Sequence, residues 1–133
     1  MPVTFEIDRE TFLIRTTCSG HVTFDEVEAH FRELAAAWER FVPFDVLLDL
    51  TECTSLPTIW QLRAVVSRVA DLGGRKSFGS CAIVASREIL FGILRMFEVF
   101  AEGKFEALRV FRSKSDAQSW LSTSARRRQD MGT

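Results

Sequence analysis

The alternation of apolar and polar residues over residues 3–8 predicts a strand with one buried face. Val3, Phe5 and Ile7 fall on one side of this segment, and polar residues fall on the other. A short polar turn separates it from a second predicted strand over residues 12–18. Because so short a connection joins antiparallel neighbours, these two strands are expected to form a β-hairpin.

The spacing of apolar residues then changes to three and four, which is the period of a helix with one buried side. Thr23 and Glu26 form a capping box at its start. The buried stripe is predicted to consist of Phe24, Val27, Phe31, Leu34, Trp38 and Phe41. Further strands are predicted over residues 44–50, 77–85 and 106–112, followed in turn by helices over residues 57–72, 87–102 and 115–121.

The resulting order ββαβαβαβα predicts the fold class. A helix between successive strands makes those strands parallel through right-handed crossovers. We therefore expect a single-domain α/β fold with a five-stranded mixed sheet, an N-terminal hairpin followed by parallel crossovers, and about four helices. The domain is predicted to span residues 1–122, and residues 123–133, which include Arg126, Arg127 and Arg128, are predicted to form a flexible basic tail.

Composition narrows the classes of function. The chain of 133 residues is 47% apolar and 26% charged, as expected for one globular domain. Its 17 basic and 18 acidic residues give a net charge of −1, without the basic excess of a nucleic-acid-binding protein. We see no secretory signal, and the apolar stretch over residues 89–101 is too short to cross a bilayer. These features predict a cytoplasmic protein without integral membrane association.

Cysteines and histidines give no metal motif. Cys18, Cys53 and Cys81 contain no C-x-x-C pair, which predicts neither a disulfide framework nor a zinc knuckle. His21 and His30 lie nine residues apart with no further ligand at a suitable spacing. We therefore predict no metal and no cofactor, and interpret His30 as a residue at the boundary of the first helical stripe.

Several segments together resemble a known family. They are the strand over residues 44–51 with the Thr54–Leu56 segment after it, the strand over residues 81–85 leading into residues 89–98, and the short segments 110–112 and 117–121. Their order and local motifs resemble the bacterial STAS/SEC14-like, or SpoIIAA-like, family of small α/β domains, over nearly the whole chain up to Leu121. The resemblance implies a SpoIIAA-like fold and a non-enzymatic role, either partner switching or binding of an apolar ligand.

The same resemblance implies an alternative in which phosphorylation regulates the module. Partner-switching members carry a phosphorylatable serine in an Asp-Ser-x-Gly type of loop after the strand that matches residues 44–50. Residues 51–58 lack that motif here, and Thr58 falls nearest to the phosphosite, with Ser55 in the same loop. A switch resembling an anti-sigma-factor antagonist would therefore use Thr58 or Ser55.

Helical phase predicts a binding surface on two helices. In the helix over residues 57–72 the inward side is assigned to Ile59, Leu62, Val66 and Val69, and in the helix over residues 87–102 to Ile89, Ile93, Met96, Phe97 and Phe100. This phase leaves a surface for a protein partner or a small apolar, lipid-like ligand, made of Trp60, Arg63, Phe91, Arg95 and Val99. A homodimer is one way to cover it. The alternative, that Trp60 and Phe91 pack under loops or against each other, stays open.

A thiol-dependent enzyme is the remaining alternative. Cys18, Cys53 and His21 fall near the same edge of the predicted sheet, where a thiol and an imidazole can act as nucleophile and base. No third group is placed to orient them, and a free cysteine commonly acts as a small buried apolar residue. The sequence therefore favours a binding module without catalytic residues.

Overall fold

The structure is a computed structural model that describes residues 2–38 and 42–132. Its elements follow the predicted order and are β1 (Val3–Asp8), β2 (Leu13–Gly20), α1 (Phe24–Ala37), β3 (Phe44–Cys53), α2 (Ile59–Asp71), β4 (Phe78–Val84), α3 (Glu88–Phe100), β5 (Ala107–Phe111) and α4 (Lys114–Gly132). A short 3₁₀ turn, η1 (Gly74–Lys76), precedes β4. The predicted single-domain α/β architecture is confirmed.

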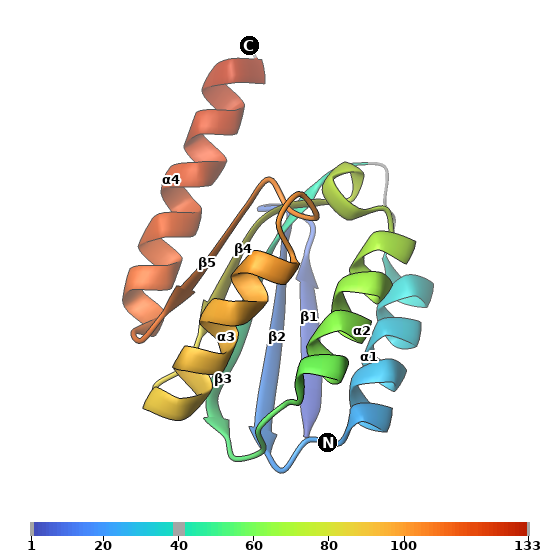
Figure 1. The fold of residues 1–133 in the computed structure, drawn as a ribbon. Helices are drawn as coiled ribbons and strands as arrows, with labels where there is room; N and C mark the ends of the chain where they lie inside the picture. Colours follow the sequence, from blue (N-terminus) through green and yellow to red (C-terminus); the bar gives the residue numbers. More distant parts are fainter. Residues whose placement is uncertain (1, 39–41, 133) are drawn as a thin grey trace.

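The five strands form one mixed sheet in the order β1–β2–β3–β4–β5. β1 is antiparallel to β2, and all other neighbours are parallel. Helices α1, α2 and α3 cover one face of the sheet, and α4 covers the other (Figure 1). The carboxyl ends of β2, β3 and β4 therefore meet at one edge, next to the amino termini of α1, α2 and α3.

The α4 face of the sheet carries a small apolar core, next to a partly polar hollow of about 260 Å³ between α4 and strands β2 and β3. Ala82 on β4 and Ala117 on α4 are fully buried, and their small side chains let the helix approach the sheet. Larger apolar residues complete this small core, namely Leu47, Val84 and Leu121 with Leu13, Phe111 and Trp120 at its margin.

The predicted inward sides of α2 and α3 are partly wrong. Ile59, Ile89 and Met96 were assigned to the interior but are exposed to solvent. On α3 the buried residues are Leu90 and Leu94, which the predicted stripe omits, and Phe97, which it includes. Because α3 is apolar around most of its circumference, more than one stripe fits a helical period, and packing against the sheet selects between them.

The last helix is longer than predicted. The predicted helix ends at Leu121 because no apolar period continues beyond that residue, whereas α4 continues to Gly132. Residues 124–131 consist mostly of good helix formers, so backbone propensity supports the extension although the sequence has no apolar period there. Within the described residues, neither α4 nor any other helix combines the length and the apolar character needed to span a bilayer.

The first helix ends earlier than its predicted stripe. Trp38 caps the carboxyl terminus of α1 in an extended conformation, with φ −121° and ψ 132°. Its indole is buried against Phe44 and Phe78, with ring centroids 6.0 and 4.7 Å away. Phe41, the last residue of the predicted stripe, lies outside the described residues.

Candidate functional site

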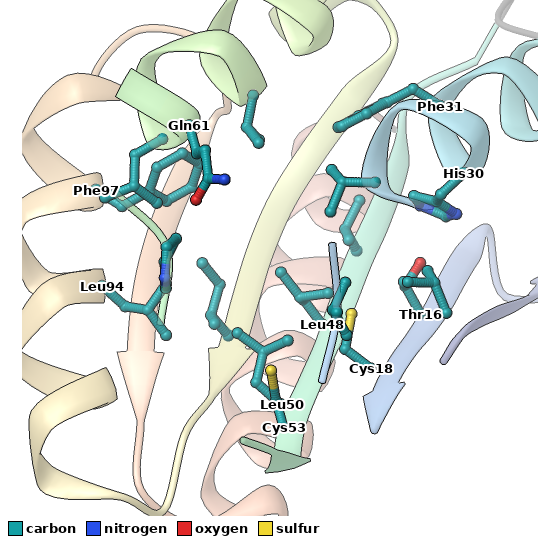
Figure 2. A pocket seen from close by; sticks show the side chains of 18 of the residues that line it. Thr16, Cys18, His30, Phe31, Leu48, Leu50, Cys53, Gln61, Leu94 and Phe97 are labelled. Atoms are coloured by element: carbon teal, nitrogen blue, oxygen red, sulfur yellow. The ribbon is translucent and has the colours of Figure 1, made fainter. Parts of the chain in front are cut away.

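A cavity of about 210 Å³ lies between the sheet and the three helices α1, α2 and α3. Strands β2, β3 and β4 form its floor, and the helices form its walls and roof (Figure 2). Most of its lining is apolar, including Phe31, Leu48, Leu50, Leu62, Leu94 and Phe97. Among the residues that the structure describes, no lysine, arginine, aspartate or glutamate lines it. The cavity is therefore suited to an uncharged, largely apolar occupant.

Local contacts fix α1 and α2, two of the three helices that border this cavity. Each begins with a capping box: the Thr23 Oγ1 accepts from the Glu26 amide at 3.3 Å, and the Thr58 Oγ1 accepts from the Gln61 amide at 3.1 Å. On the outer side, Arg68 of α2 donates to Glu28 of α1 at 2.7 Å. These contacts stabilise the starts of α1 and α2 and connect the two helices. The two helices therefore need not fill the space above the sheet.

The most accessible part of the cavity lies at the carboxyl ends of the strands. Thr23 and Leu56 are the lining residues that are solvent exposed, and they precede α1 and α2 respectively. At the other end, Phe78 and Phe105 are buried. Open α/β sheets commonly bind ligands outside the carboxyl ends of their strands, and this opening has that location.

Two polar side chains face the cavity from α1 and β2. The Nδ1 atom of His30 is buried and has no hydrogen-bond partner within the described part of the chain. Burial lowers the pKa of His30 to about 4, so its imidazole is neutral at pH 7. Thr16 is also buried and lines the cavity. Sequence reasoning missed both residues, although Thr16 occupies an inward position of β2 between Ile14 and Cys18.

The three thiols are free and buried. Burial raises the pKa of the Cys18 thiol to about 12 and raises the pKa of Cys81 as well. A protonated thiol is a poor nucleophile. Across residues 2–38 and 42–132, no three histidine, cysteine, aspartate or glutamate side chains gather where they could hold a metal ion.

Of the predicted surface residues, Trp60 and Val99 are the most exposed. Trp60 on α2 is 80% exposed and Val99 on α3 is 69% exposed, as the predicted phase requires. Arg63 places its guanidinium 5.0 Å from the ring centroid of Phe100, which connects α2 to α3. Arg95 pairs with Glu98 on its own helix at 3.8 Å. The exposed surface on α2 therefore adjoins the carboxyl-terminal end of α3.

Phe91 has a different environment from the one predicted. It is half-buried against the core, and the Arg112 guanidinium lies 3.9 Å from its ring centroid. Arg112 also forms an ion pair with Glu88 at 2.8 Å. The outward, solvent-exposed position predicted for Phe91 is therefore wrong, because this cation–π contact covers the ring. None of the five predicted surface residues lines the cavity.

The two candidate phosphorylation sites differ in accessibility. Thr58 is exposed at the amino-terminal cap of α2. Ser55 is half-buried, lines the cavity, and accepts a hydrogen bond from the Val22 amide at 3.0 Å. Thr58 is therefore the more accessible hydroxyl.

Comparison with protein families identifies the chain. The family model described as SpoIIAA-like matches residues 13–122. The chain belongs to the SpoIIAA-like family. This confirms the resemblance found in the sequence. A search of curated proteins finds no match.

Solved structures share the fold of this SpoIIAA-like chain. One is an uncharacterised protein of the DUF3478 family with a SpoIIAA-like fold from Shewanella loihica, with a TM-score of 0.61 and 24% identity over 90% of this chain and 91% of that chain. Another is an anti-sigma factor antagonist from Mycobacterium paratuberculosis, with a TM-score of 0.61 and 13% identity over 90% of this chain and 94% of that one. At these identities the likeness concerns the fold.

Proposed function

We propose that this SpoIIAA-like chain is a non-enzymatic, cytoplasmic binding module that holds a small apolar, lipid-like ligand in the cavity beneath α1, α2 and α3. The cavity itself carries the proposal, because about 210 Å³ of space with a mostly apolar lining is unusual in a tightly packed domain interior. An apolar cavity of about 150 Å³ is enough to bind benzene, so this space is large enough for a small organic ligand. The raised pKa values of the Cys18 and Cys81 thiols support a binding role over a thiol-dependent reaction.

Filling the cavity from its roof tests this function. Val65 lines the cavity from α2, so Val65→Phe places a larger side chain in the ligand's space. The matched control is Val99→Phe, which makes the same change on the exposed side of α3, outside the lining. With toluene as the probe, followed by amide chemical shifts, we expect Val65→Phe to weaken binding at least ten-fold and Val99→Phe to leave it unchanged.

Two results would contradict the cavity as the ligand site. One is equal toluene affinity in wild type and Val65→Phe. The other is loss of affinity in Val99→Phe, which would move the site to the exposed surface of α3. Native mass spectrometry of freshly purified protein adds a direct measurement, since a co-purified lipid appears as a mass increment that Val65→Phe should reduce.

A protein partner at the start of α2 is the second candidate function. Leu56, Ile59 and Trp60 are exposed large apolar residues close together in the chain. Exposed apolar surface of this kind marks interaction sites, and a tryptophan is a common energetic anchor in them. The fold shared with an anti-sigma factor antagonist is consistent with a protein partner.

A second copy of the chain is the partner that can be tested first. Sedimentation equilibrium should give a dimer for the wild-type protein and a monomer for Trp60→Ala. A wild-type monomer at all concentrations would exclude the homodimer. If the wild-type protein captures a different protein and Trp60→Ala does not, the surface at the start of α2 binds a heterologous protein partner.

Phosphoregulation is the alternative form of that second function. A phosphate on Thr58 would lie at the amino terminus of α2, where the helix dipole and free amides favour negative charge. Phosphopeptide mass spectrometry on protein from its native host should find stoichiometric phosphate on Thr58 or Ser55 if the switch operates. Unmodified peptides under all growth conditions would remove this alternative.

A further inference from the structure

Two of the polar side chains that line the cavity, His30 and Thr16, lie close together, whereas Gln61 lines it from α2 on the other side (Figure 2). Phe5 on β1 is the direct cross-strand partner of Thr16 on β2, so their side chains project from the same face of the sheet. The Phe5 ring packs edge-on against the His30 ring, with centroids 5.3 Å apart. His30 and Thr16 therefore lie close together, and Figure 2 shows them at the same end of the cavity.

His30 is held rigidly in this position. Besides Phe5, the ring of Phe31 contacts the imidazole with a centroid distance of 5.6 Å. The Nδ1 atom is buried without a partner among the described residues. A buried polar atom normally has a hydrogen-bond partner, and leaving it without one costs free energy. The free Nδ1 is thus a feature that a ligand would complete.

The Thr16 hydroxyl is the second polar group at this end. It belongs to a buried residue that lines the cavity, and no hydrogen bond to it is found within the described part of the chain. A hydroxyl both donates and accepts, as does a neutral imidazole through its two nitrogens. Together they match a ligand group that also donates and accepts.

The charge of the ligand group decides which donor and acceptor groups fit this end of the cavity. No cationic side chain from residues 2–38 or 42–132 lines the cavity, so a carboxylate or phosphate would lose its hydration without gaining a counter-ion from them. An uncharged hydroxyl avoids that cost. Most of the remaining lining is apolar and takes a hydrocarbon body, with Thr23, Ser55 and Gln61 as its other polar members.

We infer that His30 and Thr16 form a polar subsite for the hydroxyl group of an uncharged ligand, so that the occupant of the cavity is an alcohol with an apolar body. This inference rests on the proposed function and specifies its ligand class. The hydroxyl hydrogen-bonds at the His30 Nδ1 and the Thr16 Oγ1, while the hydrocarbon chain extends along the cavity toward Thr23 and Leu56.

The test compares three probes at pH 7.5: 1-octanol, octanoate and toluene. Toluene reports whether the cavity takes an apolar molecule at all, and octanoate replaces the hydroxyl group by a charge. We expect 1-octanol to bind at least ten-fold more tightly than octanoate. The His30 Nδ1 resonance should shift in ¹⁵N spectra on addition of 1-octanol and not on addition of toluene.

Variants separate the subsite from the rest of the cavity. His30→Phe and Thr16→Val keep the shape of each side chain and remove its hydrogen-bonding atoms. Each should weaken 1-octanol binding up to about ten-fold, the effect of one hydrogen bond, and leave toluene binding unchanged. The matched controls His21→Phe and Thr17→Val alter exposed residues outside the lining and should change neither affinity.

The outcomes distinguish the inference from the proposed function. If toluene binds but octanoate binds as tightly as 1-octanol, or if His30→Phe and Thr16→Val keep full affinity for 1-octanol, the hydroxyl subsite is wrong and the cavity function stands. If neither toluene nor 1-octanol binds to the wild-type protein, the cavity takes no such ligand and both proposals are wrong.

Discussion

The two faces of the sheet use the same strands for different purposes. On the α4 face, small residues such as Ala82 and Ala117 bring helix and sheet into close contact, and a hollow of about 260 Å³ beside Leu47 is lined partly by polar and charged residues. On the opposite face, α1 and α2 are fixed at their ends and leave about 210 Å³ above the strands. The comparison teaches that the two sides of one five-stranded sheet can carry hollows of different chemistry, mostly apolar beneath α1, α2 and α3 and partly charged beside α4.

Two adjacent leucines on β3 give the most direct test of how the two faces differ in packing. Leu47 is buried against α4, and Leu48 lines the cavity on the other face. Leu47→Ala should lower the free energy of unfolding by about 2–5 kcal/mol, because it creates a void in a packed core. Leu48→Ala should cost less, roughly 1–2 kcal/mol, since its side chain already borders empty space. Urea denaturation measures both, and equal losses would contradict the proposed contrast.

The pH dependence of stability should come from the cavity face. His30 has a pKa of about 4 in the folded protein, below its ordinary value of 6.5, because it is buried. Between these pH values the unfolded chain binds more protons, so the free energy of unfolding falls as the pH falls from 6.5 to 4. The total loss attributable to His30 should be about 3 kcal/mol, with almost none of it above about pH 7.

Denaturant titrations from pH 7 to pH 4 measure this dependence. His30→Phe should flatten the curve over this interval, whereas His21→Phe, which changes the exposed histidine, should leave it as in wild type. An unchanged slope in His30→Phe would show that another group controls the acid response.

Removing the cap of α2 should change the free energy of unfolding least among the three predicted effects on stability. Thr58→Ala removes the oxygen that accepts from the Gln61 amide and should lower the free energy of unfolding by about 1 kcal/mol. Thr58→Ser keeps the oxygen and is the control. Hydrogen exchange should accelerate in the first turn of α2 and stay constant in α4. Faster exchange in α4 would mean that the two faces are not independent.

Strong periodicity explains why the fold was predictable. The alternation of Val3, Phe5 and Ile7 and the apolar run around Ile83 each fit one kind of element, and the capping box at Thr23 marks a helix start. The interior face of α3 was not predictable in the same way, because Ile89 and Met96 are as apolar as Leu90 and Leu94. Only packing against the sheet decides which of them are buried.

The candidate site was harder to predict than the fold. The outward position of Trp60 follows from helical phase, but the cavity depends on how far α1 and α2 stand from the sheet, which no local pattern encodes. One signal was present in the sequence: a threonine at an inward strand position, Thr16, and a histidine beside an apolar helical stripe, His30. Their proximity arises from the pairing of β1 with β2 and the packing of α1 over both.

The placement of the tryptophans makes the protein its own optical reporter. Trp38 is buried beside Phe44 and Phe78, Trp60 is exposed on α2, and Trp120 packs against Phe111 beside α4. Each fluorophore therefore senses a separate environment. Trp38 senses the interior, Trp60 the solvent at the start of α2, and Trp120, which belongs to α4, the contact between α4 and the sheet. Versions that keep a single indole can follow events at the three locations separately, without any attached dye.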